Sequence, residues 1–207
     1  SRKVLHHLRQ RRLHRKTLFI FPHIQYSCKY IFPSLWKYSQ KKNGNISRKE
    51  KVDLTMQLTE KETTVIKDLQ TQERLCVEKY RFYEESANDP ELKQLFHKIG
   101  DDEQEHFDFL GQLLKGDVPD IPEEYDEAKN YKPCSTYNTG DNSDAKRHDQ
   151  FLCTDSIGTE KLVSSTYNSD LFQFAASGVR KLLNHIQTQE QNHAEMIYKY
   201  KTANAMA

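Results

Sequence analysis

The sequence predicts an all-α protein whose folded part is a four-helix bundle, made of two duplicated helical hairpins joined by a long crossover connection. Three observations predict this class. Apolar residues recur at three- and four-residue spacing after residue 56, which is typical of amphipathic helices. Proline, glycine and asparagine interrupt this pattern at three places, which separates four helices. A shift of 87 residues aligns the first pair of helices with the second.

The charge distribution divides the chain near residue 55. Residues 1–55 contain 14 Lys and Arg against two acidic residues, whereas the remainder contains 17 Lys and Arg against 28 Asp and Glu. A basic, acid-poor segment suits a nucleic-acid-binding arm or a targeting peptide. Its prolines and aromatic middle leave no helical stripe, however, and the first methionine is Met56. We therefore expect 1–55 to be a basic leader that is disordered or not translated in the natural protein, with the folded domain over 56–207.

Recognisable helix ends define the first hairpin, residues 57–115. Thr59 and Glu62 have the spacing of a capping box and begin a helical run that continues through residue 87. Pro90 suits the first turn of the next helix, which continues to about residue 115.

A polar, aperiodic stretch over 116–148 predicts the crossover connection. It is long enough to run the length of a bundle, whereas antiparallel neighbours need only a short loop. The second hairpin, residues 149–204, is predicted to contain helices over about 149–168 and 178–203.

The shift of 87 residues pairs nine identical residues of the two hairpins without a gap, which indicates an internal duplication. The pairs are Asp68 with Asp155, Glu73 with Glu160, Leu75 with Leu162, Tyr80 with Tyr167, Leu95 with Leu182, Ile99 with Ile186, Glu103 with Glu190, Gln104 with Gln191 and His106 with His193.

Six polar residues interrupt the apolar stripes that should face the core. Every helix carries one glutamate there, and on the second and fourth helices a histidine follows three residues later. They are Glu73, Glu103, His106, Glu160, Glu190 and His193. A carboxylate inside a bundle costs several kcal/mol unless it is paired, protonated or bound to a metal ion. One glutamate from each of two helices and Glu-x-x-His from each of the other two is the ligand set of a di-iron or di-manganese carboxylate site.

Two divalent ions would balance the four carboxylates of this set, and two imidazoles would complete their coordination. We expect Glu103 and Glu190 to bridge the ions and Glu73 and Glu160 to be terminal ligands. The cofactor predicted is thus a pair of iron ions, with manganese as the alternative. A buried Glu/His hydrogen-bond network without metal remains the other interpretation of the same residues.

Other candidate residues carry weaker signals. Tyr80 and Tyr167 lie two turns from the glutamates, and core packing is favoured over a redox role. In the acidic run 101–105 we expect only Glu103 to face inward. The four cysteines form no CxxC pair, which argues against a zinc ribbon or a rubredoxin-type iron site. No apolar run reaches the length of a membrane span, and the acidic domain lacks a basic groove for nucleic acid.

Four segments resemble the spore coat protein F family, which belongs to the ferritin-like superfamily near the rubrerythrins. They are QERLCVEKY (72–80), DDEQEH (101–106), FLCTDSIGTEKLVSSTYN (151–168) and LLNHIQTQEQNHAEMIYKY (182–200). The resemblance covers about 57–204 and implies a ferritin-like, rubrerythrin-like bundle. It also implies a structural component of the spore coat, made in the mother-cell cytoplasm, with other coat proteins and further copies of itself as partners. All six of the superfamily's metal positions are filled by the residues named above.

Two functions follow from the resemblance. The first is a structural coat protein with a dinuclear metal centre. The alternative is a rubrerythrin-like di-iron peroxidase or oxidase that protects against peroxide. The lack of a rubredoxin-type CxxC pair disfavours this enzyme without excluding it, because an external electron donor could serve.

Overall fold

Four long helices contain most of the residues that the computed structural model describes, 56–121 and 127–206. They are α2 (Glu60–Ser86), α3 (Pro90–Leu114), α5 (Asp144–Asp170) and α6 (Ser177–Ala203). A short helix, α4 (Glu127–Asn130), lies in the connection, and a 3-10 turn (Leu171–Gln173) follows α5. No β-strand occurs within these two ranges, in agreement with the predicted all-α class. The predicted leader, 1–55, lies outside the described residues.

The ends of the first two long helices follow from local sequence. The Thr59 hydroxyl group accepts a hydrogen bond from the Glu62 backbone N–H at 3.2 Å, and the Glu62 carboxylate accepts one from the Thr59 backbone N–H at 2.9 Å. This reciprocal pair is the predicted capping box. Asp89 caps α3, whose first residue is Pro90.

Helix α5 begins five residues earlier than the sequence predicts, at Asp144 instead of residue 149. Ser143 caps it by accepting a hydrogen bond from the Lys146 backbone N–H at 3.2 Å. The extra turn contacts the first hairpin through polar groups: the Ser86 hydroxyl group lies 2.8 Å from His148 Nε2, and the Asn88 side-chain amide donates to the Ala145 carbonyl at 3.5 Å. Apolar periodicity does not detect such a turn, and the connection is correspondingly shorter than 116–148.

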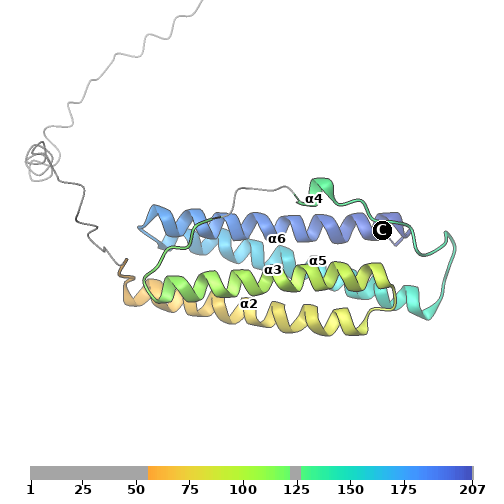
Figure 1. The fold of residues 1–207 in the computed structure, drawn as a ribbon, viewed down its shortest axis with the longest axis horizontal. Helices are drawn as coiled ribbons and strands as arrows, with labels where there is room; N and C mark the ends of the chain where they lie inside the picture. Colours follow the sequence, from red (N-terminus) through yellow and green to blue (C-terminus); the bar gives the residue numbers. More distant parts are fainter. Residues whose placement is uncertain (1–55, 122–126, 207) are drawn as a thin grey trace, which may run out of the picture. The chain divides into compact units, whose positions relative to one another are not determined.

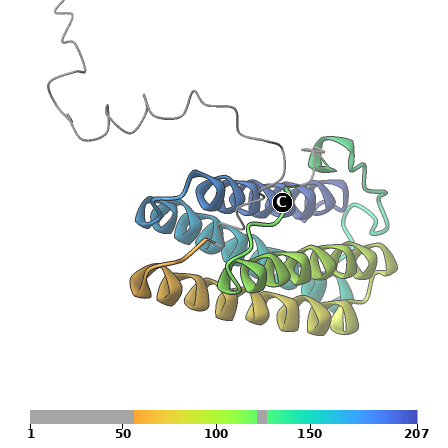
Figure 2. The same cartoon turned by 60° about the vertical axis from the view of Figure 1, so that its left-hand side comes forward.

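The long helices pack as two hairpins, α2 with α3 and α5 with α6 (Figures 1 and 2). Contacts of α2 with α5 and of α3 with α6 hold the hairpins together. The connection leaves α3 beside the start of α2, where the Met56 backbone N–H donates to the Gly116 carbonyl at 3.1 Å. The connection ends at the opposite end of the four helices, where α5 begins, and its short helix α4 packs on α6 (Figure 1).

Two apolar clusters fill the interior. One contains Ile66, Leu69, Leu110, Leu113, Leu182 and Ile186, and the other contains Leu92, Phe96, Ile99, Leu152, Ile197 and Tyr200. Along α3 and along α6, one cluster precedes the Glu-x-x-His residues and the other follows them. The fold therefore places these polar residues near mid-height, between two apolar layers.

No helix in the described ranges combines the length and the apolar character that a membrane span requires.

Candidate metal centre

All six predicted ligands lie inside the helix bundle, and none is more than 1 % exposed. Each long helix contributes one glutamate, because a stripe at three- and four-residue spacing turns the same face of the helix to the core. On α3 and α6 the histidine lies one turn after the glutamate, so both side chains project to the same side. The structure thus brings together every site residue that the sequence singled out.

The six residues form two overlapping groups of four. Glu73, Glu103, His106 and Glu190 each offer a ligand atom within 4.8 Å of the others'. Glu103, Glu160, Glu190 and His193 do the same. Glu103 and Glu190 belong to both groups, which is the position that bridging carboxylates occupy between two ions. Glu73 and Glu160 each belong to one group, as terminal ligands do.

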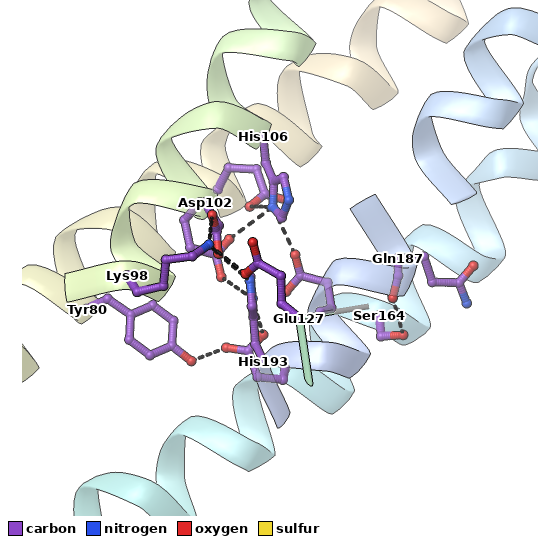
Figure 3. A network of polar contacts seen from close by, with 12 residues as sticks. Tyr80, Lys98, Asp102, His106, Glu127, Ser164, Gln187 and His193 are labelled. Carbon is purple, nitrogen blue, oxygen red and sulfur yellow. Dashed lines mark hydrogen bonds and ion pairs between the residues drawn. The ribbon is translucent and has the colours of Figure 1, made fainter. Parts of the chain in front are cut away.

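The two imidazoles lie among the carboxylates. His106 Nδ1 is 3.1 Å from Glu190 Oε1 and 3.4 Å from Glu103 Oε2. His193 Nδ1 is 3.3 Å from Glu103 Oε1 and 3.4 Å from Glu160 Oε2. The planes of the two rings are inclined by 26°, and their centroids lie 5.9 Å apart. Figure 3 shows both histidines within the polar network.

Most polar atoms that face the centre of the group make no well-formed hydrogen bond. These atoms are Glu73 Oε2, both carboxylate oxygens of Glu103 and Glu190, Glu160 Oε2, and the Nδ1 atoms of His106 and His193. Buried polar groups are normally satisfied, and leaving one unpaired costs about 1–3 kcal/mol. Oxygen and imidazole donors that converge without hydrogen bonds fit divalent ions such as iron or manganese.

Two tyrosines hold the outer carboxylate oxygens of Glu73 and Glu160. The Tyr80 hydroxyl group on α2 donates to Glu160 Oε1 on α5, and the Tyr167 hydroxyl group on α5 donates to Glu73 Oε1 on α2. Each bond satisfies one carboxylate oxygen and leaves the other, Oε2, turned to the centre. Both tyrosines are fully buried. The interpretation that they only pack the core is therefore incomplete, because their hydroxyl groups orient two candidate ligands.

Asp102 supports only one of the two histidines. Its Oδ2 atom lies 3.3 Å from His193 Nε2, and both of its carboxylate oxygens accept hydrogen bonds from the Lys98 ammonium group (Figure 3). Lys98 also forms an ion pair with Glu127 of α4 at 2.8 Å. The prediction that only Glu103 of the run 101–105 faces inward is thus wrong. Asp102 reaches a histidine of the other hairpin, a contact that depends on how α3 packs against α6.

Burial raises the pKa of two of the clustered carboxylates, whereas the neighbouring imidazoles lower that of a third. Burial raises the pKa of Glu73 to about 7, and burial together with repulsion from Glu103 raises the pKa of Glu190 well above its ordinary value. Burial would also raise the pKa of Glu103, but the two imidazoles beside it outweigh this effect and hold the pKa low. Burial opposes protonation of His106 and His193, yet the surrounding carboxylates raise the pKa of both. Without metal, the raised pKa values favour protons on Glu73, Glu190 and the two imidazoles, and a bound cation would compete with these protons.

The two tyrosines had a sequence signal that could have revealed them. Tyr80 follows Glu73 by seven residues and Tyr167 follows Glu160 by seven, which is two helical turns on the same face. The 87-residue shift also pairs the two tyrosines with each other. Asp102 had no such signal, since the residue 87 positions later is Gln189.

Comparison with known proteins gives one match. No curated protein and no solved structure matched the chain. The family model described as the Coat F domain matches residues 148–206, a range that covers most of α5 and all of α6 and contains Glu160, Glu190 and His193. The second hairpin, with its half of the candidate ligands, is accordingly a match to the Coat F domain, which supports a spore coat protein.

Proposed function

We propose that this protein is a spore coat component whose helices form a ferritin-like, duplicated four-helix bundle around a dinuclear metal centre. The ions are iron, with manganese as the alternative. The observation that carries the metal centre is the set of converging, buried oxygen and nitrogen atoms that make no well-formed hydrogen bond. The Coat F match to residues 148–206 supports the location in the spore coat.

The donor set favours iron or manganese over other metals. Four carboxylates and two imidazoles are hard and intermediate donors, whereas structural zinc and copper(I) sites use thiolates. Cys76 is buried near the centre, but burial and the nearby glutamates raise the pKa of its thiol far above the ordinary value. Its sulfur atom belongs to neither of the two groups of converging ligand atoms. The ligands would be Glu73 and His106 for one ion, Glu160 and His193 for the other, and Glu103 and Glu190 for both.

A metal count tests the centre. The full chain is incubated anaerobically with ferrous iron, freed of unbound metal and analysed by elemental analysis, in parallel with manganese. We expect two ions per chain, and fewer than one ion for Glu103→Ala/His106→Ala. The matched control is Asp101→Ala/Glu105→Ala, which removes two exposed acidic residues of the same helix and should keep two ions. Fewer than one ion in the unaltered chain would contradict the proposal and favour the metal-free network.

The coat assignment has its own test. Fractionation of spores should recover the protein with the coat, together with the other coat proteins that we propose as partners. Recovery only in the spore interior would contradict it. The proposal places synthesis in the mother-cell cytoplasm and allows assembly through further copies of the chain.

A rubrerythrin-like peroxidase or oxidase is the second candidate. Its support is the ligand set itself, because Glu103 and Glu190, which belong to both groups, would hold two metal ions close enough to act together. The test compares peroxide consumption by the iron-loaded chain with that by Glu103→Ala/His106→Ala, in the presence of an external electron donor. Equal rates would leave only the structural role.

A further inference from the structure

A pocket of about 300 Å³ between α5 and α6 reaches the candidate ligands Glu160 and Glu190. Its other walls are small or polar and include Ser164, Gln187 and Ala194. The Ser164 hydroxyl group donates to the Gln187 carbonyl at 3.5 Å, which joins the two helices beside the pocket. Figure 3 shows Ser164 and Gln187 on the side of the polar network opposite Tyr80.

The corresponding face of the other hairpin has different side chains. The 87-residue shift pairs Ser164 with Val77, Ala194 with Phe107, and Gln187 with Gly100. Val77 is 4 % exposed and belongs to the core, whereas Ser164 is half-buried. At two of the three positions the first hairpin thus carries the larger, apolar side chain, over Glu73 and Glu103 instead of Glu160 and Glu190.

The third position, Gly100, lies where α2 and α3 of the first hairpin approach each other closely. A Cβ atom added to Gly100 would lie 3.4 Å from the Tyr80 Cβ atom, so α2 and α3 are already in van der Waals contact there. Gln187, at the equivalent point of α6, has a side chain that must be accommodated beside α5.

The first hairpin has a pocket of about 590 Å³ whose walls include Gln70 and Phe107, but neither Glu73 nor Glu103 lines it. Hydrogen bonds join α2 and α3 beside this pocket and further along the helices. The Gln70 amide donates to the Phe107 carbonyl at 3.2 Å, and the Arg81 guanidinium donates to the Gln104 side chain at 3.3 Å, both from α2 to α3. In the second hairpin Gln191, the counterpart of Gln104, donates to the Gln187 carbonyl of its own helix.

From this difference we propose that the pocket is a one-sided binding site for a small hydrogen-bonding molecule at the metal centre. The inference rests on the proposed metal centre and adds the face from which an exogenous ligand reaches it. The ligand would lie beside Glu160 and Glu190, while Val77 and Phe107 cover the equivalent face of the first hairpin.

The walls define the chemistry of the ligand. Hydroxyl and amide groups donate and accept hydrogen bonds, Lys161 adds a positive charge, and the acidic residues in the wall are the two candidate ligands themselves. The volume is at the lower end of the range for small-molecule sites. The pocket therefore suits a neutral molecule such as hydrogen peroxide or a small anion, and azide is a suitable probe.

Azide binding to the iron-loaded, oxidised full chain tests the site by absorbance titration. Ala194→Phe, which places the side chain of Phe107 at the equivalent position of α6, should raise the azide Kd at least tenfold while the chain keeps two ions. Ser164→Val copies Val77, is a smaller change, and should raise the Kd in the same direction. Asn184→Phe adds the same ring at an exposed position of α6 outside the pocket and should leave the Kd unchanged. An unchanged Kd in both Ala194→Phe and Ser164→Val would overturn the proposal.

Thiol labelling tests the opening without metal. Ser164→Cys and Val77→Cys place a thiol at equivalent positions of the two hairpins, and the metal-free proteins are treated with methyl methanethiosulfonate. Peptide mapping should show modification of residue 164 at least ten times faster than of residue 77, and a slower rate at 164 when Ala194→Phe is added. Equal rates at 164 and 77 would overturn the one-sided opening.

The two experiments distinguish a failure of the ligand site from a failure of the proposed metal centre. A chain that takes up no metal but shows fast labelling at 164 would refute the metal centre and leave the one-sided opening intact. A chain that holds two ions but binds azide equally well in every variant would keep the metal centre and refute the ligand site.

Discussion

The Tyr80 hydroxyl group on α2 donates a hydrogen bond to Oε1 of Glu160 on α5, so that one hairpin orients a candidate ligand of the other. Both side chains are buried, and the bond leaves only Oε2 of this carboxylate free to face the centre. The reciprocal bond runs from Tyr167 to Glu73. The polar centre thus also fastens the two hairpins together.

Tyr80→Phe should destabilise the metal-free protein by about 1–3 kcal/mol, because it leaves a buried carboxylate oxygen without a donor. The measurement is the free energy of unfolding from urea titration followed by circular dichroism. Tyr167→Phe should have a similar cost, since it removes the equivalent bond. Tyr83→Phe is the control, because its partner Asp155 is 44 % exposed and water can replace the hydroxyl group. Equal costs for Tyr80→Phe and Tyr83→Phe would show that the buried bond has no special role.

Asp102→Asn should weaken metal binding about 10- to 100-fold, the usual effect of removing a carboxylate that orients a histidine ligand. The loss should affect one ion more than the other, because Asp102 contacts His193 and not His106. A competition titration with a chromogenic chelator measures both affinities. The neighbouring, exposed Asp101→Asn is the control. Equal weakening of both ions would argue against a contact specific to His193.

Metal should stabilise the folded chain, because the converging ligand atoms are assembled only by folding. Free metal at 100 times its Kd should add about 2.7 kcal/mol to the free energy of unfolding. The measurement is thermal unfolding with and without manganese, followed by reversal with a chelator. Glu103→Ala/His106→Ala should show no such increase, and a metal-dependent rise in that variant would point to binding elsewhere on the chain.

Glu62→Gln should lower stability at neutral pH by about 0.3–1 kcal/mol, because glutamine can still accept the capping hydrogen bonds but lacks the negative charge near the helix N-terminus. The backbone N–H and then the hydroxyl group of Thr59 stabilise the ionised carboxylate and hold the pKa of Glu62 below 4.5. A lowered pKa means that this stabilisation is complete above pH 4.5 and is lost as the pH falls through the folded-state pKa.

Urea titrations of Glu62→Gln and the unaltered chain between pH 3 and 7 measure this difference. The two free energies of unfolding should converge at the acidic end of the range. A constant difference would mean that the carboxylate charge is not the stabilising feature.

Local sequence was sufficient for the parts of the fold that depend on neighbouring residues. The capping box at Thr59 and the proline at the start of α3 lie where the sequence predicts them, because each acts within a single turn. The start of α5 was wrong by five residues, since the additional turn contacts Ser86 and Asn88, about 60 residues away in the chain.

By itself, the sequence determined which side chains face the core. Helical periodicity fixes the face on which a residue lies, so the positions of the six candidate ligands followed from their spacing alone. Only the tertiary structure decided what those side chains meet. The bonds of Tyr80 and Tyr167, the contact of Asp102 with His193 and the pocket beside Ser164 all join different helices, and most of them join different hairpins. Such contacts depend on the register and separation of packed helices, which periodicity within one helix does not encode.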